Sequence, residues 1–227
     1  MKEPRLWTRL DNAAKIFPPT SSNRDTKVFR FTCELTETVD KESLQNALDK
    51  TILLFPFYRS VIRRGLFWHY LEESNLVPTV VEESKPPCSP LYYGDKKTLL
   101  FEVSYFKNRI NLEIYHALTD GTGALHFLRN LVFNYLKDKH KDLITEEISL
   151  DYDASLEQKK LDGFLKYYVK ESIGFTEKPV LAHVIKGTPT PNNRLAVIEG
   201  RVSVKKLLNL VHQHNSTISQ FLTAVLI

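Results

Sequence analysis

One short segment of the sequence combines residue types that perform acid–base chemistry. It is the run 116–121, with the sequence HALTDG, in which His116 is followed four residues later by Asp120 and then by Gly121. An imidazole titrates near neutral pH, so His116 is a candidate general base for a substrate hydroxyl or amine. By spacing alone, a histidine on an apolar face is more often a packed core residue, and that interpretation stays open beside the catalytic one.

A strand and a helix are predicted on either side of this segment. Apolar and polar residues alternate over 98–106 and again over 109–116, which predicts an antiparallel pair of strands. The same alternation places His116 on the apolar, inward face. Beyond Gly121 the apolar residues recur at helical spacing. The histidine is therefore expected where a strand ends and a helix begins.

The rest of the sequence predicts a mixture of strands and helices. Residues 27–36 alternate as in a half-buried strand, and helical spacing follows until Pro56. The further features expected are a helix cap at Asp40, a hairpin over 58–71 with Gly65 at a positive φ, a strand over 194–202, and helices over 161–169, 204–214 and from 218 onward. The last helix is apolar nearly all round, so we expect it to be buried.

Composition places the chain among globular proteins. Its 227 residues are 42% apolar and 26% charged, and no run has the character of a membrane span or a signal peptide. A cytoplasmic location is therefore the expectation. Two cysteines cannot form a disulfide framework, and we expect a core thiol at Cys33 and a loop position for Cys88.

The charges do not indicate a nucleic acid partner. The 31 Lys and Arg residues are scattered among 27 acids, for a net charge of +4, and the nearest basic run with aromatic neighbours, 59–68, is short. A membrane surface or an acidic metabolite fits this charge equally well.

Other catalytic signatures are missing from the sequence. It contains no G-x-S-x-G, G-x-x-x-x-G-K-[ST] or G-x-G-x-x-G pattern. His116, Asp120 and His126 offer ligand types that zinc or iron accepts, but His126 falls about two turns along a separate helix. We therefore predict no metal.

Taken with its surroundings, the HALTDG run resembles a known family. His116, Asp120 and Gly121 match the HxxxDG motif of the chloramphenicol acetyltransferase-like superfamily of CoA-dependent acyltransferases, which includes condensation domains and alcohol acetyltransferases. Upstream, the run 54–59 is similar to the family's segment in which a helix ends at a proline and an arginine follows. Downstream, the run 194–227 is similar to the opening of the family's second lobe.

The resemblance implies a fold and a reaction. The fold is an α/β lobe, an α+β sandwich with a mixed, largely antiparallel sheet and packed helices. The reaction is transfer of an acyl group from acyl-CoA, or from the thioester of an acyl-carrier protein, to a small-molecule alcohol or amine. Acyl-CoA is then a cosubstrate, and no bound cofactor is implied.

The resemblance also implies roles for individual residues. His116 would be the general base, and Asp120 would point away from the substrate and pair with Arg59, a structural support. Gly121 would leave room for the turn and for the substrate. Tyr115 stands where many condensation domains carry a second histidine, which favours the alcohol acyltransferase side of the family.

A second departure concerns the extent of the chain. The DFGWG motif of the family's second lobe is absent. We therefore expect an acyltransferase-like N-terminal lobe over 1–187, a linker over 188–193 and the start of a truncated second lobe over 194–227. A missing second lobe or self-association would complete the substrate tunnel. The alternative function is a non-catalytic lobe, or an inactive fragment, that binds a partner or acyl chain without turnover.

Overall fold

The computed structural model describes residues 7–94, 96–142, 144, 181, 184, 186–188, 190 and 198–226. The chain divides into two compact units, residues 1–170 and 171–227, each of which is described by itself. The first unit contains β1 (Trp7–Arg9), the 3-10 turn η1 (Ala14–Ile16), α1 (Phe17–Thr20), β2 (Val28–Glu34), α2 (Lys41–Leu54), the 3-10 turn η2 (Pro56–Arg59), β3 (Ser60–Arg64), β4 (His69–Glu73), β5 (Val81–Glu82), β6 (Phe101–Phe106), β7 (Arg109–Tyr115) and α3 (Gly121–Lys139). The second contains α5 (Val204–Gln213) and α6 (Ile218–Leu226).

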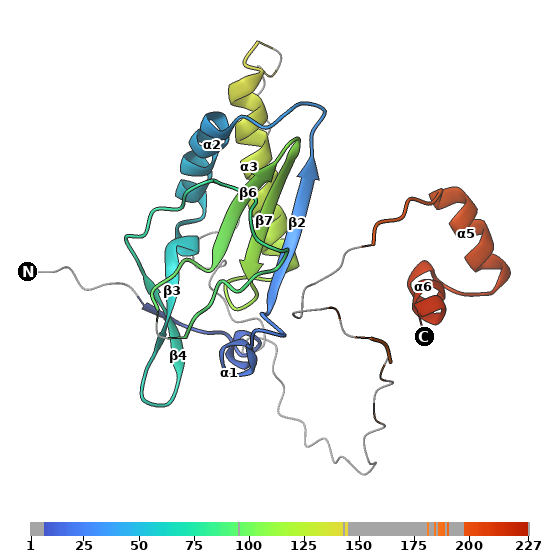
Figure 1. Cartoon of the computed structure of the whole chain (residues 1–227), viewed down its shortest axis with the longest axis horizontal. Helices are drawn as coiled ribbons and strands as arrows, with labels where there is room; N and C mark the ends of the chain where they lie inside the picture. The colour runs from blue at the N-terminus through green and yellow to red at the C-terminus, as the bar shows by residue number, and fades with distance from the viewer. Residues whose placement is uncertain are drawn as a thin grey trace, which may run out of the picture. The chain divides into compact units, whose positions relative to one another are not determined.

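The larger sheet is mixed and largely antiparallel, as the sequence predicts. Its order is β2-β7-β6-β5, with β7 antiparallel to both neighbours and β5 parallel to β6. On one face Phe31, Leu112 and Val103 stand in register across three strands. Helix α3 covers this face and packs against α2 (Figure 1). The helices bury the apolar face, so the core lies between the sheet and this helix pair.

Aromatic side chains fill the centre of that core. Tyr58 stacks on Phe127 of α3, with ring centroids 4.3 Å apart and planes 15° apart. Phe55 and Phe101 contact the same ring of Phe127 edge-on. These contacts connect the end of α2, strand β6 and helix α3, and they hold α3 in place over the sheet.

The opposite face of the sheet is polar, yet it is also buried. Asn111 and Glu113 of β7 are only 1% and 3% exposed, although alternation predicts a solvent-facing side for this strand. Arg30 on β2 explains the difference, because its guanidinium donates to Glu113 at 2.8 Å and also pairs with Glu83. The backbone N–H of Cys88 donates to the same Glu113 oxygen. The loop that carries Glu83 and Cys88 therefore covers the polar face.

The two cysteines occupy the settings that the sequence indicates. Cys33 packs against the core from β2, and its burial raises the pKa of the thiol. Cys88 lies in the covering loop at a φ of 57°. Burial and the neighbouring Glu113 carboxylate raise the pKa of the Cys88 thiol. Neither thiol forms a disulfide.

The smaller sheet contains the predicted hairpin in a different register. Its order is β1-β4-β3, with antiparallel pairing throughout. The expected positive φ at Gly65 is wrong. A longer turn runs from Gly65 to Trp68, where the N–H of Gly65 donates to the carbonyl of Trp68 at 2.7 Å. This turn closes without a left-handed residue, so no positive φ calls for glycine there, but a Cβ on Gly65 would lie 3.2 Å from the carbonyl oxygen of Trp68.

The helices predicted in the second unit are present, but their burial differs from expectation. Ser203 caps α5, and Thr217 accepts from the N–H of Gln220 at the start of α6. No residue of α6 is buried, so the expectation of a buried last helix is wrong for the described residues. The apolar surface of α6 has too few neighbours among the described residues to exclude solvent.

Three further expectations concern the C-terminal half of the chain, and part of that region lies outside the described residues. Residues 198–202 form no strand in the structure, and residues 194–197 of the same predicted strand lie outside the described residues. The predicted helix over 161–169 also lies outside them, as does most of the linker over 188–193. The predicted domain bounds therefore remain a prediction. No helix in the described ranges is long and apolar enough to cross a membrane.

Candidate active site

His116 lies directly after β7, at the end of the sheet. Its backbone N–H donates to the carbonyl of Lys27 at 2.8 Å, which extends the pairing of β2 with β7 by one residue. The imidazole is half-buried. It stacks on Phe17, with centroids 4.6 Å apart and planes 16° apart, and it contacts Phe29 at 5.0 Å. Two aromatic rings therefore fix the plane of the imidazole.

The ring nitrogens of His116 have no hydrogen-bond partner among the residues that the structure describes. They are also absent from the set of fully buried polar atoms without partners, so they reach open space. A histidine in this condition differs from the packed core histidine that spacing alone favours, because a core histidine satisfies its nitrogens internally.

The neighbouring Tyr115 ties a distant segment to this point. Its hydroxyl lies 2.8 Å from the hydroxyl of Ser21, which in turn donates to the carbonyl of Phe17 at 2.8 Å. Tyr92 stacks on the Tyr115 ring. Burial raises the pKa of Tyr115 to about 12. This chain of contacts holds Phe17, and with it the ring that covers His116.

Asp120 begins helix α3. Its carboxylate accepts from the N–H of Gly123 at 2.8 Å, and its carbonyl accepts from the N–H of Ala124 at 3.0 Å. The side chain is exposed to solvent. Asp120 is therefore an N-cap, which fixes where the helix starts and how the 116–120 turn leaves the strand.

The predicted ion pair between Asp120 and Arg59 is not formed in the structure. The carboxylate of Asp120 is directed to the helix terminus, where the N–H of Gly123 and the positive end of the helix dipole attract it. Arg59 ends η2, and its carbonyl accepts two hydrogen bonds from Ser74. Its Nε is buried without a hydrogen-bond partner.

The two glycines of this turn have different surroundings. A Cβ added to Gly121 would meet nothing closer than the Phe31 ring at 3.9 Å, and the φ of Gly121 is not positive. The turn therefore does not require a glycine there, contrary to expectation. A Cβ on Gly123 would lie 2.1 Å from the Thr119 hydroxyl. The crowded position is therefore Gly123, where any Cβ would force the Thr119 hydroxyl to move.

A pocket of about 370 Å³ lies in front of the imidazole. His116, Asp120 and His126 line it, together with the apolar side chains of Phe17 and Phe57. Gly121 and Arg59 are not among the lining residues. Of the four predicted site residues, the structure thus brings His116 and Asp120 together at one cavity. No group of three His, Cys, Asp or Glu side chains in the described ranges is arranged to hold a metal ion.

Sequence reasoning missed Phe17, Ser21 and Gly123. Phe17 and Ser21 lie in a segment without helical or strand periodicity, and a contact with a residue 94 positions away leaves no local pattern. Gly123 did carry a signal, since it follows Gly121 by two residues in the turn before a helix. That signal identifies a tight turn but does not say which glycine is the crowded one.

Comparison with known proteins gives relatives at the level of structure. No protein-family model matches the sequence, and no curated protein matches it. A mutant of the starter condensation domain of rhizomide synthetase RzmA matches at a TM-score of 0.51 and 12% identity, over 68% of this chain and 42% of that one. The unmutated RzmA domain matches at a TM-score of 0.48 and 13% identity, over 65% of this chain and 39% of that one. F. graminearum TRI101 complexed with ethyl coenzyme A matches at a TM-score of 0.48 and 11% identity, over 75% of this chain and 46% of that one.

These relatives are much longer than the part that matches. The chain spans less than half the length of each of the three structures. At such low sequence identity, the structural similarity supports a shared fold and nothing further about function. The chain has the chloramphenicol acetyltransferase-like fold of condensation domains, present here as a partial lobe.

Proposed function

We propose that this chain carries the acid–base half of an acyltransferase site. The reaction is transfer of an acyl group from acyl-CoA, or from a carrier-protein thioester, to an alcohol or amine, with His116 as the general base. The observation that carries this proposal is the imidazole itself. Aromatic rings fix its plane, and its nitrogens face a pocket of about 370 Å³ without a partner among the described residues.

The surroundings of His116 leave its imidazole available to accept a proton from a substrate. No acidic residue forms a hydrogen bond or ion pair with the imidazole in the described part of the chain, so no carboxylate stabilises its charged form directly. Stacking on Phe17 restricts rotation of the imidazole, which therefore keeps one orientation beside the pocket that it lines.

The proposed step needs no covalent intermediate on the protein. A nitrogen of His116 takes the proton from the acceptor O–H or N–H while that oxygen or nitrogen attacks the thioester carbonyl carbon. The new C–O or C–N bond forms, the C–S bond breaks, and the departing thiolate takes a proton from the imidazolium. The neutral imidazole is thereby restored, and the protein chiefly supplies a positioned base.

Asp120 acts in this proposal as a positioning residue. It fixes the start of α3, and with it the turn that follows His116. The fold comparison supports acyl transfer as the general chemistry, because condensation domains share the fold. CoA as the donor draws on F. graminearum TRI101, which was crystallised with ethyl coenzyme A. A second lobe or a second copy of the chain would supply the rest of the tunnel.

The test is thiol release from acyl-CoA substrates of several chain lengths over a panel of alcohols and amines. His116→Ala should lower the acceptor-dependent rate by about 100- to 10,000-fold, the usual cost of losing a general base. His126→Ala is the matched control, because His126 lines the same pocket but is not the proposed base. Its rate should stay within about tenfold of the wild-type rate.

Three outcomes decide the proposal. Acceptor-dependent release that disappears in His116→Ala and persists in His126→Ala supports it. Equal rates in wild type and His116→Ala refute His116 as the base. If no release occurs, the assay is repeated with the chain extended beyond Ile227 or with an added second lobe. A chain that still binds acyl-CoA, equally well in wild type and His116→Ala, is then a binding lobe without turnover.

A further inference from the structure

The turn between β3 and β4 presents three large apolar side chains to solvent. Leu66, Phe67 and Trp68 are 89%, 90% and 59% exposed. They follow one another in the chain at the tip of a hairpin, which extends from the end of the smaller sheet (Figure 1). Scattered surface hydrophobic residues are ordinary, but a contiguous exposed cluster at a projecting tip marks an interaction site.

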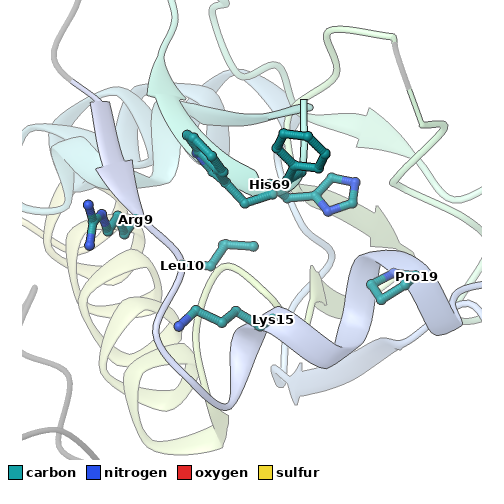
Figure 2. Close-up of a pocket in the computed structure, with 7 residues that line it drawn as sticks. Arg9, Leu10, Lys15, Pro19 and His69 are labelled. Carbon is teal, nitrogen blue, oxygen red and sulfur yellow. The ribbon is translucent and has the colours of Figure 1, made fainter. Parts of the chain in front are cut away.

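A cavity of about 560 Å³ lies beside this tip. Phe67, Trp68 and Leu10 give it apolar walls, and Arg9, Lys15 and His69 add basic groups (Figure 2). Among the residues that the structure describes, none that lines this cavity is acidic. The cavity therefore combines apolar walls with basic groups, which suits a partner that is apolar on one side and anionic on the other.

The basic groups gather at the same end of the sheet as the tip. Arg64 pairs in register with His69, and Arg9 pairs with Tyr70 one position further from the turn. Within the described part of the chain, Arg9 and Arg64 form no ion pair, and the ammonium of Lys15 donates only to the neutral side chain of Asn12. Their charges are therefore available to an external anion.

The next arginine along the strand makes a useful contrast. Arg63 lies 3.5 Å from Glu72, so its charge is matched within the sheet. Acidic residues of the hairpin, Glu72 and Glu73, lie at the far end of β4 from the turn. The uncompensated positive charge is thus confined to the tip end.

We propose that the β3–β4 tip docks this chain onto an anionic phospholipid bilayer. Leu66, Phe67 and Trp68 enter the interfacial region, where an indole with one polar N–H is favoured. Arg9, Lys15 and Arg64 contact the headgroup phosphates. The docking is peripheral, since it needs only a loop that enters the interface. A bilayer fits this surface better than a protein partner does. The apolar tip would reach the acyl chains, while the basic collar of Arg9, Lys15 and Arg64 would meet the anionic headgroups above them.

This inference is independent of the proposed function. Its residues do not line the pocket of His116. Loss of membrane binding therefore leaves the acyl-transfer test unaffected, and an inactive His116→Ala variant should still bind vesicles. The two proposals fail separately.

The test is sedimentation of the full chain with vesicles of phosphatidylcholine alone, or of phosphatidylcholine with one third phosphatidylserine. We expect binding to the anionic vesicles that weakens as salt is added. The chain has two tryptophans, so in a Trp7→Phe background the emission reports Trp68 alone. That emission should shift to shorter wavelength when anionic vesicles are added.

Substitutions at the tip and its collar should weaken this binding by predictable factors. Leu66→Ser with Phe67→Ser should reduce the partition coefficient by at least about tenfold, since each loses the burial of a large apolar side chain. Arg9→Gln with Arg64→Gln should reduce it about 30-fold on anionic vesicles, at about fivefold for each charge. These side chains are exposed and are expected to leave folding intact, which circular dichroism verifies.

Matched controls remove comparable groups elsewhere. Leu53→Ser with Val77→Ser removes two apolar side chains that are 71% and 72% exposed, and it should change binding by less than about twofold. Lys41→Gln with Arg129→Gln removes two exposed charges on α2 and α3 and should have an equally small effect if the contact is local.

Several results would overturn the proposal. They are an absence of wild-type binding to anionic vesicles, binding that the tip variants retain, and an equal loss in the control pairs. Tip-dependent self-association without vesicle binding would instead assign the surface to a second copy of the chain. Binding of dispersed short-chain phosphatidylserine without binding of vesicles would assign it to a single amphiphile.

Discussion

Replacement of Asp120 separates two explanations of why a carboxylate follows the histidine. In the structure this side chain caps α3 through the N–H of Gly123 at 2.8 Å, and it does not pair with Arg59. Asparagine caps a helix about as well as aspartate, whereas alanine does not. An ion pair, by contrast, is lost in both variants. Asp120→Asn and Asp120→Ala should therefore differ in effect.

The expected magnitudes follow from the two contributions that the carboxylate makes. The cap hydrogen bond is worth about 1 kcal/mol, and a negative charge at a helix N-terminus adds about 0.3 to 1 kcal/mol. Asp120→Ala loses both, about 1.5 kcal/mol in all. Asp120→Asn loses only the charge and keeps the turn after His116, so its acyl-transfer rate should stay within about fivefold of wild type.

Asp40 provides an internal control for this experiment. It caps α2 in the same way, with its carboxylate accepting from the N–H of Ser43 at 2.7 Å, and it does not line the His116 pocket. Asp40→Ala should lower the free energy of unfolding about as much as Asp120→Ala does, without lowering the rate of the folded protein. Asp120→Ala should lower both.

Urea unfolding followed by circular dichroism measures the stabilities, and thiol release measures the rates. Hydrogen exchange at the Gly123 amide reports the cap directly, since that N–H loses its acceptor only in the alanine variant. Equal losses in Asp120→Asn and Asp120→Ala would contradict the cap. If Arg59→Met then reproduced that loss, the carboxylate would be acting through an ion pair with Arg59.

Three further predictions concern the same strand and turn. Gly121→Ala should leave stability within about 0.5 kcal/mol, whereas Gly123→Ala should cost about 1 to 2 kcal/mol in urea unfolding because its Cβ meets the Thr119 hydroxyl; equal costs would contradict the geometry. The pKa of Tyr115 is raised to about 12 in the folded chain. The contribution of this side chain to the free energy of unfolding is therefore complete below about pH 10 and is lost as the pH rises through 12. In unfolding measured as a function of pH, the difference between wild type and Tyr115→Phe, on the order of 1 kcal/mol, should shrink over that range. Glu113→Gln should cost about 2 to 3 kcal/mol by the same assay, because Arg30 stays buried with Glu83 as its remaining partner, and a cost below about 0.5 kcal/mol would refute a structural role for the pair.

Periodicity predicts the elements around the candidate site well, for a physical reason. Strand β7 and helix α3 each bury one apolar face, and that burial imposes the spacing from which both are predicted. The cap at Asp40 is equally local, since a cap residue and its acceptor N–H lie three residues apart. The position of His116 at the junction follows directly from these elements.

Contacts that are distant in sequence escape this kind of reasoning. Phe17 covers His116, yet the two are about a hundred positions apart and Phe17 lies in a short segment with no repeat. The polar face of the sheet is similar. Arg30 and Glu113 have the spacing of solvent-facing residues, and only the loop with Glu83 makes that face buried. A buried ion pair has the same sequence pattern as an exposed one.

The segment between β1 and β2 connects the two sites inferred in this chain. Leu10, Lys15 and Pro19 line the cavity beside the hairpin tip, whereas Ala14 and Phe17 line the pocket of His116. Neighbouring residues of one short segment thus serve both cavities, so a substitution within it alters both and cannot separate them. Phe67 lines only the cavity beside the tip, His116 lines only its own pocket, and Leu66 lines neither of the two. Variants at these positions are the ones that assign membrane docking and acid–base chemistry to separate surfaces, because each removes one set of contacts and leaves the shared segment intact.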